Sequence, residues 1–443
     1  MRIQLSEQFT YGKLLRFTLP SILMMIFTSI YGVVDGYFVS NYAGKEAFTA
    51  VNFIMPFLMI LGALGFMFGT GGAALIAKTM GEGDKERAGR QFSLIVYSTI
   101  VGGILFAVIG IFLLRPVAIL LGATDEMADS CELYGRIILY TLPLYMLQLE
   151  FQSFFPAAEK SELGLIITVA AGLANIVGDA ILVKVFGLGV IGAAAATAIS
   201  QAVGGIIPLI YFALPNKSLL RLGKTKFDKR VLLKVSTNGS SELMSNISIS
   251  LVSMLYNVQL LKYAGEDGVA AYGVMMYVNL IFLSLFIGYS IGTAPIISYH
   301  YGAKDSDELK SLLKKSTVII GIFAALMLTA AELLGPMLSR IFVGYDEALL
   351  SLTESGFRIF SFSFLFAGFA IFGSSFFTAL NDGLTSALIS FLRTLVLQVA
   401  AVLLLPLVFD IDGIWLSIVA AELSAAAVTL LFILGKRKKY GYL

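Results

Sequence analysis

Long apolar runs recur along the whole chain and are separated by short polar segments. Each run holds about 20 mainly apolar residues, which is enough for a helix to cross a hydrocarbon core of roughly 30 Å. A helix satisfies its own backbone hydrogen bonds inside lipid, and the strict alternation of a membrane barrel strand is absent, so each run predicts a transmembrane helix. The twelve predicted spans cover residues 14–39, 47–78, 91–115, 130–157, 163–186, 190–214, 231–261, 268–300, 312–335, 348–379, 384–409 and 413–435.

The second half of this pattern repeats the first. A shift of 221 residues places 42–84 on 263–305, and 12 of these 43 positions are then identical. Roughly three or four identities would arise by chance in so apolar a composition. Six spans per repeat is an even number, so both halves have the same orientation. We therefore predict an all-α polytopic membrane protein of two parallel six-helix repeats, with lobes over 1–215 and 235–443 and a linker over 216–234. In transporters of this kind, substrate sites lie between or within the halves.

Composition and charge place the chain in a membrane rather than on nucleic acid. Hydrophobic residues make up 58% of the chain and charged residues 14%, with a net charge of only +2. One set of span ends holds 23 Lys and Arg and the opposite set holds 7. This asymmetry predicts a multi-pass protein of the cell membrane, inner or plasma, with both termini and the linker in the cytoplasm. We expect the seven basic residues of the linker to rest on anionic headgroups.

The sequence offers little for catalysis. Cys131 and His300 are the only residues of their types, so no disulfide and no Cys or His metal cluster is expected. The stretch 187–192 matches G-x-G-x-x-G, but no strand precedes it, and we interpret it as a tight turn with close helix packing. No paired acids stand at a loop. We therefore expect no enzymatic activity, no cofactor and no structural metal, and a protein that works as a monomer in the bilayer.

Carboxylates inside the spans are the most informative residues. A charge at mid-membrane costs roughly 2.5–3.5 kcal/mol, so it usually faces a cavity or a partner and has a function. Asp35 lies late in the first span and Asp179 late in the fifth, with Asn175 one helical turn before Asp179. At 1.5 Å per residue, both carboxylates lie roughly 10 Å below the outer end of the membrane. This matching depth would let them share a cation or a proton.

Several further polar residues are weaker candidates. Tyr31 lies on the same helical stripe as Asp35, Gln148 and Gln152 share one face of the fourth span, and Glu242 stands in the seventh. For Glu242, as for Glu150, Glu332 and Glu422, a hydrogen bond in helix packing is as good an interpretation as a functional role. Arg393 in the eleventh span could neutralise one of these acids, and the sequence does not choose which.

Short motifs in order along the chain resemble those of the multidrug and toxic compound extrusion (MATE) transporters over essentially its whole length. These motifs are Ile30-Tyr-Gly-Val-Val-Asp35-Gly-Tyr-Phe38, Ala50-Val-Asn-Phe-Ile-Met-Pro-Phe57, Phe68-Gly-Thr-Gly-Gly-Ala73, Met80-Gly-Glu-Gly-Asp-Lys85, Asn175-Ile-Val-Gly-Asp179 and Gly189-Val-Ile-Gly-Ala-Ala-Ala-Ala-Thr197. In one prokaryotic branch, residues of the first, fifth and sixth spans form a cation site in the first half. By resemblance, that site would consist of Asp35, Asn175, Asp179 and Thr197, and could hold Na⁺ or H⁺ as the coupling ion.

The resemblance implies a cation-coupled antiporter that exports amphipathic, often cationic, small molecules across the cell membrane. Another branch of the family uses an acid in the tenth span, but residues 357–379 contain none, so the resemblance favours coupling in the first half. The alternative is a flippase of the same superfamily for lipid-linked oligosaccharides. Such a protein needs buried cations for a pyrophosphate, and Arg393 is the only basic residue deep in a span.

Overall fold

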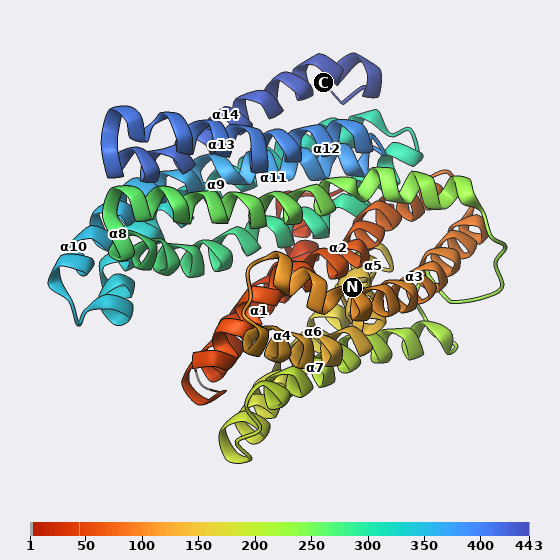
Figure 1. Ribbon diagram of the computed structural model, residues 1–443. Coiled ribbons are helices and arrows are strands. Elements are labelled where there is room, and N and C mark those ends of the chain that lie inside the picture. Colours follow the sequence, from red (N-terminus) through yellow and green to blue (C-terminus); the bar gives the residue numbers. More distant parts are fainter. Residues whose placement is uncertain (1–2, 44, 443) are drawn as a thin grey trace.

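The computed structural model describes residues 3–43 and 45–442, and the side chains of all of these except residues 45–48. The described residues are almost entirely helical and contain no strand. Figure 1 shows the first half, coloured red to yellow-green, as one bundle beside a second that runs from green to blue. The α-helices are α1 (Tyr11–Phe38), α2 (Lys45–Gly81), α3 (Lys85–Leu120), α4 (Asp125–Tyr140), α5 (Leu142–Ala157), α6 (Ser161–Gly178), α7 (Gly189–Ala213), α8 (Lys229–Gly302), α9 (Ser306–Val343), α10 (Glu347–Phe360), α11 (Phe364–Ala379), α12 (Gly383–Phe391), α13 (Leu397–Leu404) and α14 (Pro406–Tyr440). Short π-helical segments η1 (Val39–Ala43), η2 (Asp179–Val185) and η4 (Leu392–Val396) and a 3-10 segment η3 (Ser361–Ser363) join some of them.

The predicted fold, twelve spans in two parallel repeats, is confirmed. Within the described residues, ten continuous helical stretches are long and apolar enough to cross a membrane. One of them, α8, contains two spans, because Gly265 leaves the helical conformation with φ 62° and ψ −153°. Glycine adopts positive φ without the steric cost that a Cβ would bring, so the chain can turn back there. Helices α4 and α5, which meet at Thr141, together make the remaining span.

Aspartate caps fix the starts of equivalent helices in the two halves. The side chain of Asp84 accepts a hydrogen bond from the Arg87 N–H at 2.9 Å, and Asp305 accepts one from the Glu308 N–H at 3.1 Å. Such caps satisfy an otherwise unpaired N–H and contribute about 1 kcal/mol each. The two halves therefore both have aspartate at this position of the repeat for a local structural reason.

The last residues of the linker that we predicted over 216–234 lie in helix α8. Helix α8 already begins at Lys229, because Asp228 accepts hydrogen bonds from the N–H groups of Arg230, at 2.9 Å, and Val231. The hydrophobic pattern could not show this, since the first turn of α8 is strongly basic and reads as a loop.

The two halves meet through glycines on the side of the molecule where Lys and Arg cluster, which we call the basic side. A Cβ added to Gly81 would lie 2.0 Å from the backbone oxygen of Tyr299, and one added to Gly302 would lie 2.0 Å from that of Lys78. These two contacts are exchanged by the 221-residue repeat. The interface between α2 and α8 thus has an approximate two-fold axis, and backbone packs on backbone at this side.

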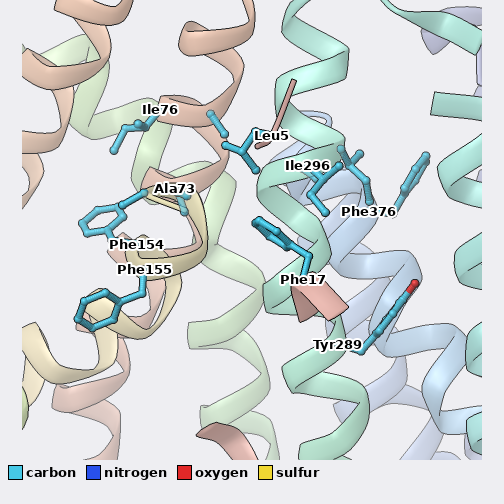
Figure 2. Close-up of a cluster of buried hydrophobic side chains, with 14 of the residues drawn as sticks. Leu5, Phe17, Ala73, Ile76, Phe154, Phe155, Tyr289, Ile296 and Phe376 are labelled. Atoms are coloured by element: carbon cyan, nitrogen blue, oxygen red, sulfur yellow. The ribbon is translucent and has the colours of Figure 1, made fainter. Parts of the chain in front are cut away.

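A hydrophobic cluster and the N-terminal segment reinforce this closed side. Figure 2 shows Phe154 and Phe155 of the first half and Tyr289 and Phe376 of the second in one cluster, with Leu5 among them. The N–H of Leu5 donates to Glu159 of the first half at 2.8 Å. Four residues later, the N–H of Phe9 donates to Glu308 of the second half at 2.9 Å. The segment before α1 therefore links both halves on the basic side.

Candidate functional site

The structure brings Asp35, Asn175 and Asp179 together between α1 and α6. The carboxyl group of Asp35 lies close enough to interact with both the Asp179 carboxyl and the Asn175 amide. Asp179 is fully buried and Asn175 is 2% exposed. Asp179 is also the first residue of η2, where the Phe186 N–H bonds to the Ile181 oxygen five residues back at 2.9 Å. Such π-helical turns are frequent at functional sites, because they redirect side chains within a helix.

The carboxylate pair, Asp35 and Asp179, has oxygens without partners. Both carboxyl oxygens of Asp179, Oδ1 of Asp35 and Oδ1 of Asn175 are buried and make no hydrogen bond to any described residue. No Lys, Arg or His in the described part of the chain forms an ion pair with either carboxylate. Buried polar atoms are nearly always satisfied, so four orphaned oxygens at one place need a physical explanation. All four are hard oxygen donors of the kind that bind a proton or an alkali cation.

Two tyrosines that the sequence analysis did not identify complete the surroundings of the pair. Tyr134 of α4 is 1% exposed, interacts with Thr197 of α7, and lies near both carboxylates. Tyr145 of α5 is the second of these tyrosines, and it lies near Tyr31, which itself lies near Asp35 and interacts with Gln148 of α5. Thr197 thus contacts Tyr134 and Gln148 contacts Tyr31, and both tyrosines lie near the carboxylate pair.

Glycines provide the space for these large side chains. A Cβ on Gly172 would lie 2.9 Å from the Tyr31 ring, and one on Gly204 would lie 2.6 Å from the Gln148 side chain. A Cβ on Gly62 would lie only 2.0 Å from the Tyr145 ring. The polar site is therefore closely packed, and its glycines hold its aromatic and amide groups in position.

The sequence does contain a signal that could have identified Tyr134 and Tyr145. Tyr134, Thr141, Tyr145 and Gln148 recur at spacings of seven, four and three residues, which puts them on one helical face. Aromatic residues are so common in these spans that this spacing alone would select many other positions.

Two of the weaker candidates lie elsewhere. Gln152 lies one turn beyond Gln148 toward the basic side, buried, with neither amide atom hydrogen-bonded to a described residue. Glu242 belongs to the second half, where Arg393 is the charged group that acts on it. Arg393 itself donates to both carboxyl oxygens of Glu422, with Nε 2.8 Å from Oε2 and NH2 2.9 Å from Oε1. The acid that Arg393 neutralises is thus Glu422.

The position in the second half that corresponds to Asp35 is Tyr256, and the nearby carboxylate of Glu422 is paired with Arg393. The Tyr256 hydroxyl donates to Gln398 Oε1 at 2.8 Å and lies 2.7 Å from Ser417 Oγ. Tyr272 stacks on its ring with a centroid distance of 5.3 Å. The repeat therefore has an uncompensated carboxylate pair in the first half and a satisfied hydrogen-bond network in the second. Among the described residues, no group of three or more His, Cys, Asp or Glu side chains is placed to hold a metal ion.

Comparisons with known proteins agree on one family. The model of the MatE family matches the chain twice, over residues 20–181 and 243–404. The "Multidrug export protein MepA" of Staphylococcus haemolyticus (strain JCSC1435) is 24% identical over 434 residues, covering 98% of this chain and 95% of that protein. A crystal structure of "MATE in complex with MaL6" has a TM-score of 0.93 at 21% identity, covering 98% of both chains. The "outward-facing conformation of a multidrug resistance MATE family transporter of the MOP superfamily" also has a TM-score of 0.93, at 20% identity and with the same coverage of both chains. At such identity, these two structures show the fold alone.

Proposed function

The chain belongs to the MatE family of membrane transporters, and we propose that it is an antiporter, driven by Na⁺ or H⁺, that exports organic cations and other drug-like compounds. We place it in the cell membrane with its basic side in the cytoplasm, as the distribution of Lys and Arg favours. Its similarity to proteins named for multidrug export supports the substrate class.

The observation that carries this proposal is the uncompensated carboxylate pair. Two negative charges at close range in a site of low dielectric repel each other strongly, and neither has a described cationic partner. Binding one proton or one Na⁺ removes most of this repulsion. Asp35, Asp179, Asn175 and Thr197 would offer Na⁺ four oxygen-bearing groups, whereas a proton needs a single carboxylate oxygen.

Coupling follows if an ion and a cationic substrate compete for the same negative field. When the ion binds, it weakens the attraction of the pair for the substrate, which then leaves. Each positive charge that moves inward gains about 2.3 kcal/mol per 100 mV of membrane potential. For an uncharged substrate that energy corresponds to a concentration ratio of about fifty-fold. For a substrate with one positive charge, a one-for-one exchange moves no net charge, so the concentration gradient of the ion, or a second ion, must drive export.

The closed basic side supports an outward-facing assignment for this conformation. The glycine contacts of α2 with α8 and the hydrophobic cluster of Figure 2 seal the side that we place in the cytoplasm. Substrate would then reach the site between the halves from the cytoplasm only after these contacts separate, as alternating access requires.

The flippase alternative depends on a basic residue deep in a span that is free to bind a pyrophosphate, and Arg393 is not free. Arg393 was the one deep basic residue that could bind a pyrophosphate, and both carboxyl oxygens of Glu422 already engage its guanidinium group. An anionic headgroup would have to displace a buried, bidentate ion pair, which is costly because it leaves Glu422 unpaired.

Transport by purified protein in liposomes tests the proposal. A fluorescent organic cation should move against its gradient when an inward Na⁺ or H⁺ gradient is imposed, and testing the two ions separately identifies the one that couples. Asp35→Asn and Asp179→Asn keep the side-chain shapes and should abolish this movement. Asp412→Asn, which changes an exposed aspartate, serves as the matched control and should transport normally. Near-normal transport by both site variants would refute the assigned coupling site.

A further inference from the structure

A basic pocket that is open to the surroundings lies between the start of α3 and the linker. Its volume is about 1470 Å³, and its charged lining consists of Arg87, Arg90, Lys224, Lys226, Asp228, Lys229 and Arg230. Six of these seven side chains are cationic, and the one carboxylate, Asp228, caps α8. Of the six cations only Arg90 has a carboxylate partner among the described residues, Glu86. The pocket therefore has a large excess of positive charge.

The pocket is a built site rather than a loose loop. The linker is fixed to α3 by hydrogen bonds from the Gly223 N–H to Ser93 Oγ at 3.0 Å and from the Thr225 hydroxyl to the Arg90 carbonyl at 2.9 Å. The Tyr97 hydroxyl also donates to the Gly223 carbonyl at 3.3 Å. On the α3 face, Arg87, Arg90 and Gln91 lie one turn apart and line the same wall. The linker is thus held against the first half.

One buried polar group in the wall lacks a partner. Gln91 is 4% exposed, and its Oε1 makes no hydrogen bond to any described residue. A buried amide that is left unsatisfied costs free energy. Oε1 has almost no accessible surface, so a ligand in the pocket reaches it only when the Gln91 side chain rotates toward the pocket. Protonated oxygens of a hydrated anion or of a glycerol headgroup would supply such a partner.

Exposed aromatic side chains adjoin the same pocket. Phe227 is 77% exposed and Tyr97 is 41% exposed, and both belong to its lining. The apolar part of α3 begins immediately after Gln91, so the pocket lies at the membrane surface. A free anion would gain nothing from these rings, whereas an acyl chain would cover them. The basic side is also the one expected to face the anionic leaflet.

We propose that this pocket binds the phosphate headgroup of an anionic phospholipid. The headgroup phosphate lies among Lys224, Lys226 and Arg87, its glycerol oxygens meet Gln91 once that side chain rotates toward the pocket, and its chains run along Tyr97 and Phe227. Lys229 and Arg230 at the start of α8 line the same pocket as Arg87 of α3, so the pocket lies where the linker joins the second half. This assignment does not depend on the transported substrate or the coupling ion.

The test uses full-length protein purified in a neutral detergent and freed of lipid. Native mass spectrometry measures binding of dioleoyl phosphatidylglycerol, dioleoyl phosphatidylcholine and inorganic pyrophosphate. We expect the phosphatidylglycerol to bind at least tenfold more tightly than the phosphatidylcholine. Near a membrane each Lys or Arg contributes about a fivefold factor, so Lys224→Gln/Lys226→Gln should weaken phosphatidylglycerol binding about 25-fold. The matched pair Lys310→Gln/Lys314→Gln removes the same charge from exposed lysines of α9 and should change it less than twofold.

A third variant separates a built site from general surface charge. Gln91→Leu keeps the net charge and should weaken phosphatidylglycerol binding several-fold, while an unchanged melting temperature shows that the protein remains folded. Equal losses in both lysine pairs, or no loss in either, would overturn the proposal. Displacement of the bound lipid by equimolar pyrophosphate would identify a soluble anion as the ligand and would equally overturn the lipid assignment.

Discussion

A single methyl group at Gly239 should open the closed basic side. An added Cβ there would lie 1.9 Å from the backbone oxygen of Met67 and 3.1 Å from the backbone nitrogen of Gly71. Non-bonded atoms prefer separations near 3.5 Å, so α8 must move away from α2 by roughly 1.5 Å. Both neighbours are backbone atoms, and no side chain can rotate to relieve the clash. Overpacking of this kind costs about 1–3 kcal/mol, which shifts the equilibrium away from the closed conformation by about five- to 150-fold.

Distance measurements by electron paramagnetic resonance detect this shift. Spin labels at Lys85 and Lys310, on exposed helix starts of opposite halves, should report a longer distance in Gly239→Ala than in the parent protein. Gly89→Ala provides the control, because nothing lies within 4 Å of its added Cβ. A folded, monodisperse Gly239→Ala protein with an unchanged distance distribution would show that this contact does not hold the side closed.

Three further predictions concern stability and topology. Burial alone would raise the pKa of Asp382, but hydrogen bonds from Lys436, Tyr440 and Thr385 lower it from 3.8 to about 2. The stabilising effect of the Asp382 carboxylate is therefore complete above about pH 4 and is lost as the pH falls to 2. The melting temperature of Asp382→Asn should accordingly lie below that of the parent protein at pH 7 and approach it near pH 2. Tyr256→Phe should lower stability by about 1 kcal/mol and leave ion dependence of transport unchanged, whereas altered ion dependence would show that the second half takes part in coupling. Lys224→Cys in a Cys131→Ser background should be protected from membrane-impermeant thiol reagents in intact cells, and rapid labelling from outside would reverse the topology.

The spans were predictable because hydrophobicity along the chain reports directly on the membrane as solvent. The ends of the spans were less predictable than the spans themselves. Helix α8 starts at Lys229 because an aspartate caps it there, and the fourth span is broken at Thr141. Such features depend on one or two side chains and barely alter a hydrophobic average.

The carboxylate pair was accessible to sequence reasoning because depth in the membrane can be counted along a helix. Lateral distances between helices cannot be counted in this way. No pattern along the chain could therefore place Tyr134 beside Thr197, or favour Glu422 over Glu242 as the partner of Arg393. These pairs are separated by whole spans and are set by how the helices pack.

The reciprocal contacts of Gly81 and Gly302 restrict the kind of motion by which the halves can separate. Each glycine receives a carbonyl oxygen of the opposite helix, so the two backbones interlock rather than lie flat against each other. Sliding α2 along α8 would drive those oxygens into the Cβ atoms of the adjacent residues, which makes a shear displacement unfavourable. Lifting the helices directly apart meets no such obstacle, and the approximate two-fold axis releases both contacts in the same step. The interface therefore favours a hinge opening between rigid halves over a gradual shear, with few partly open states between its end points.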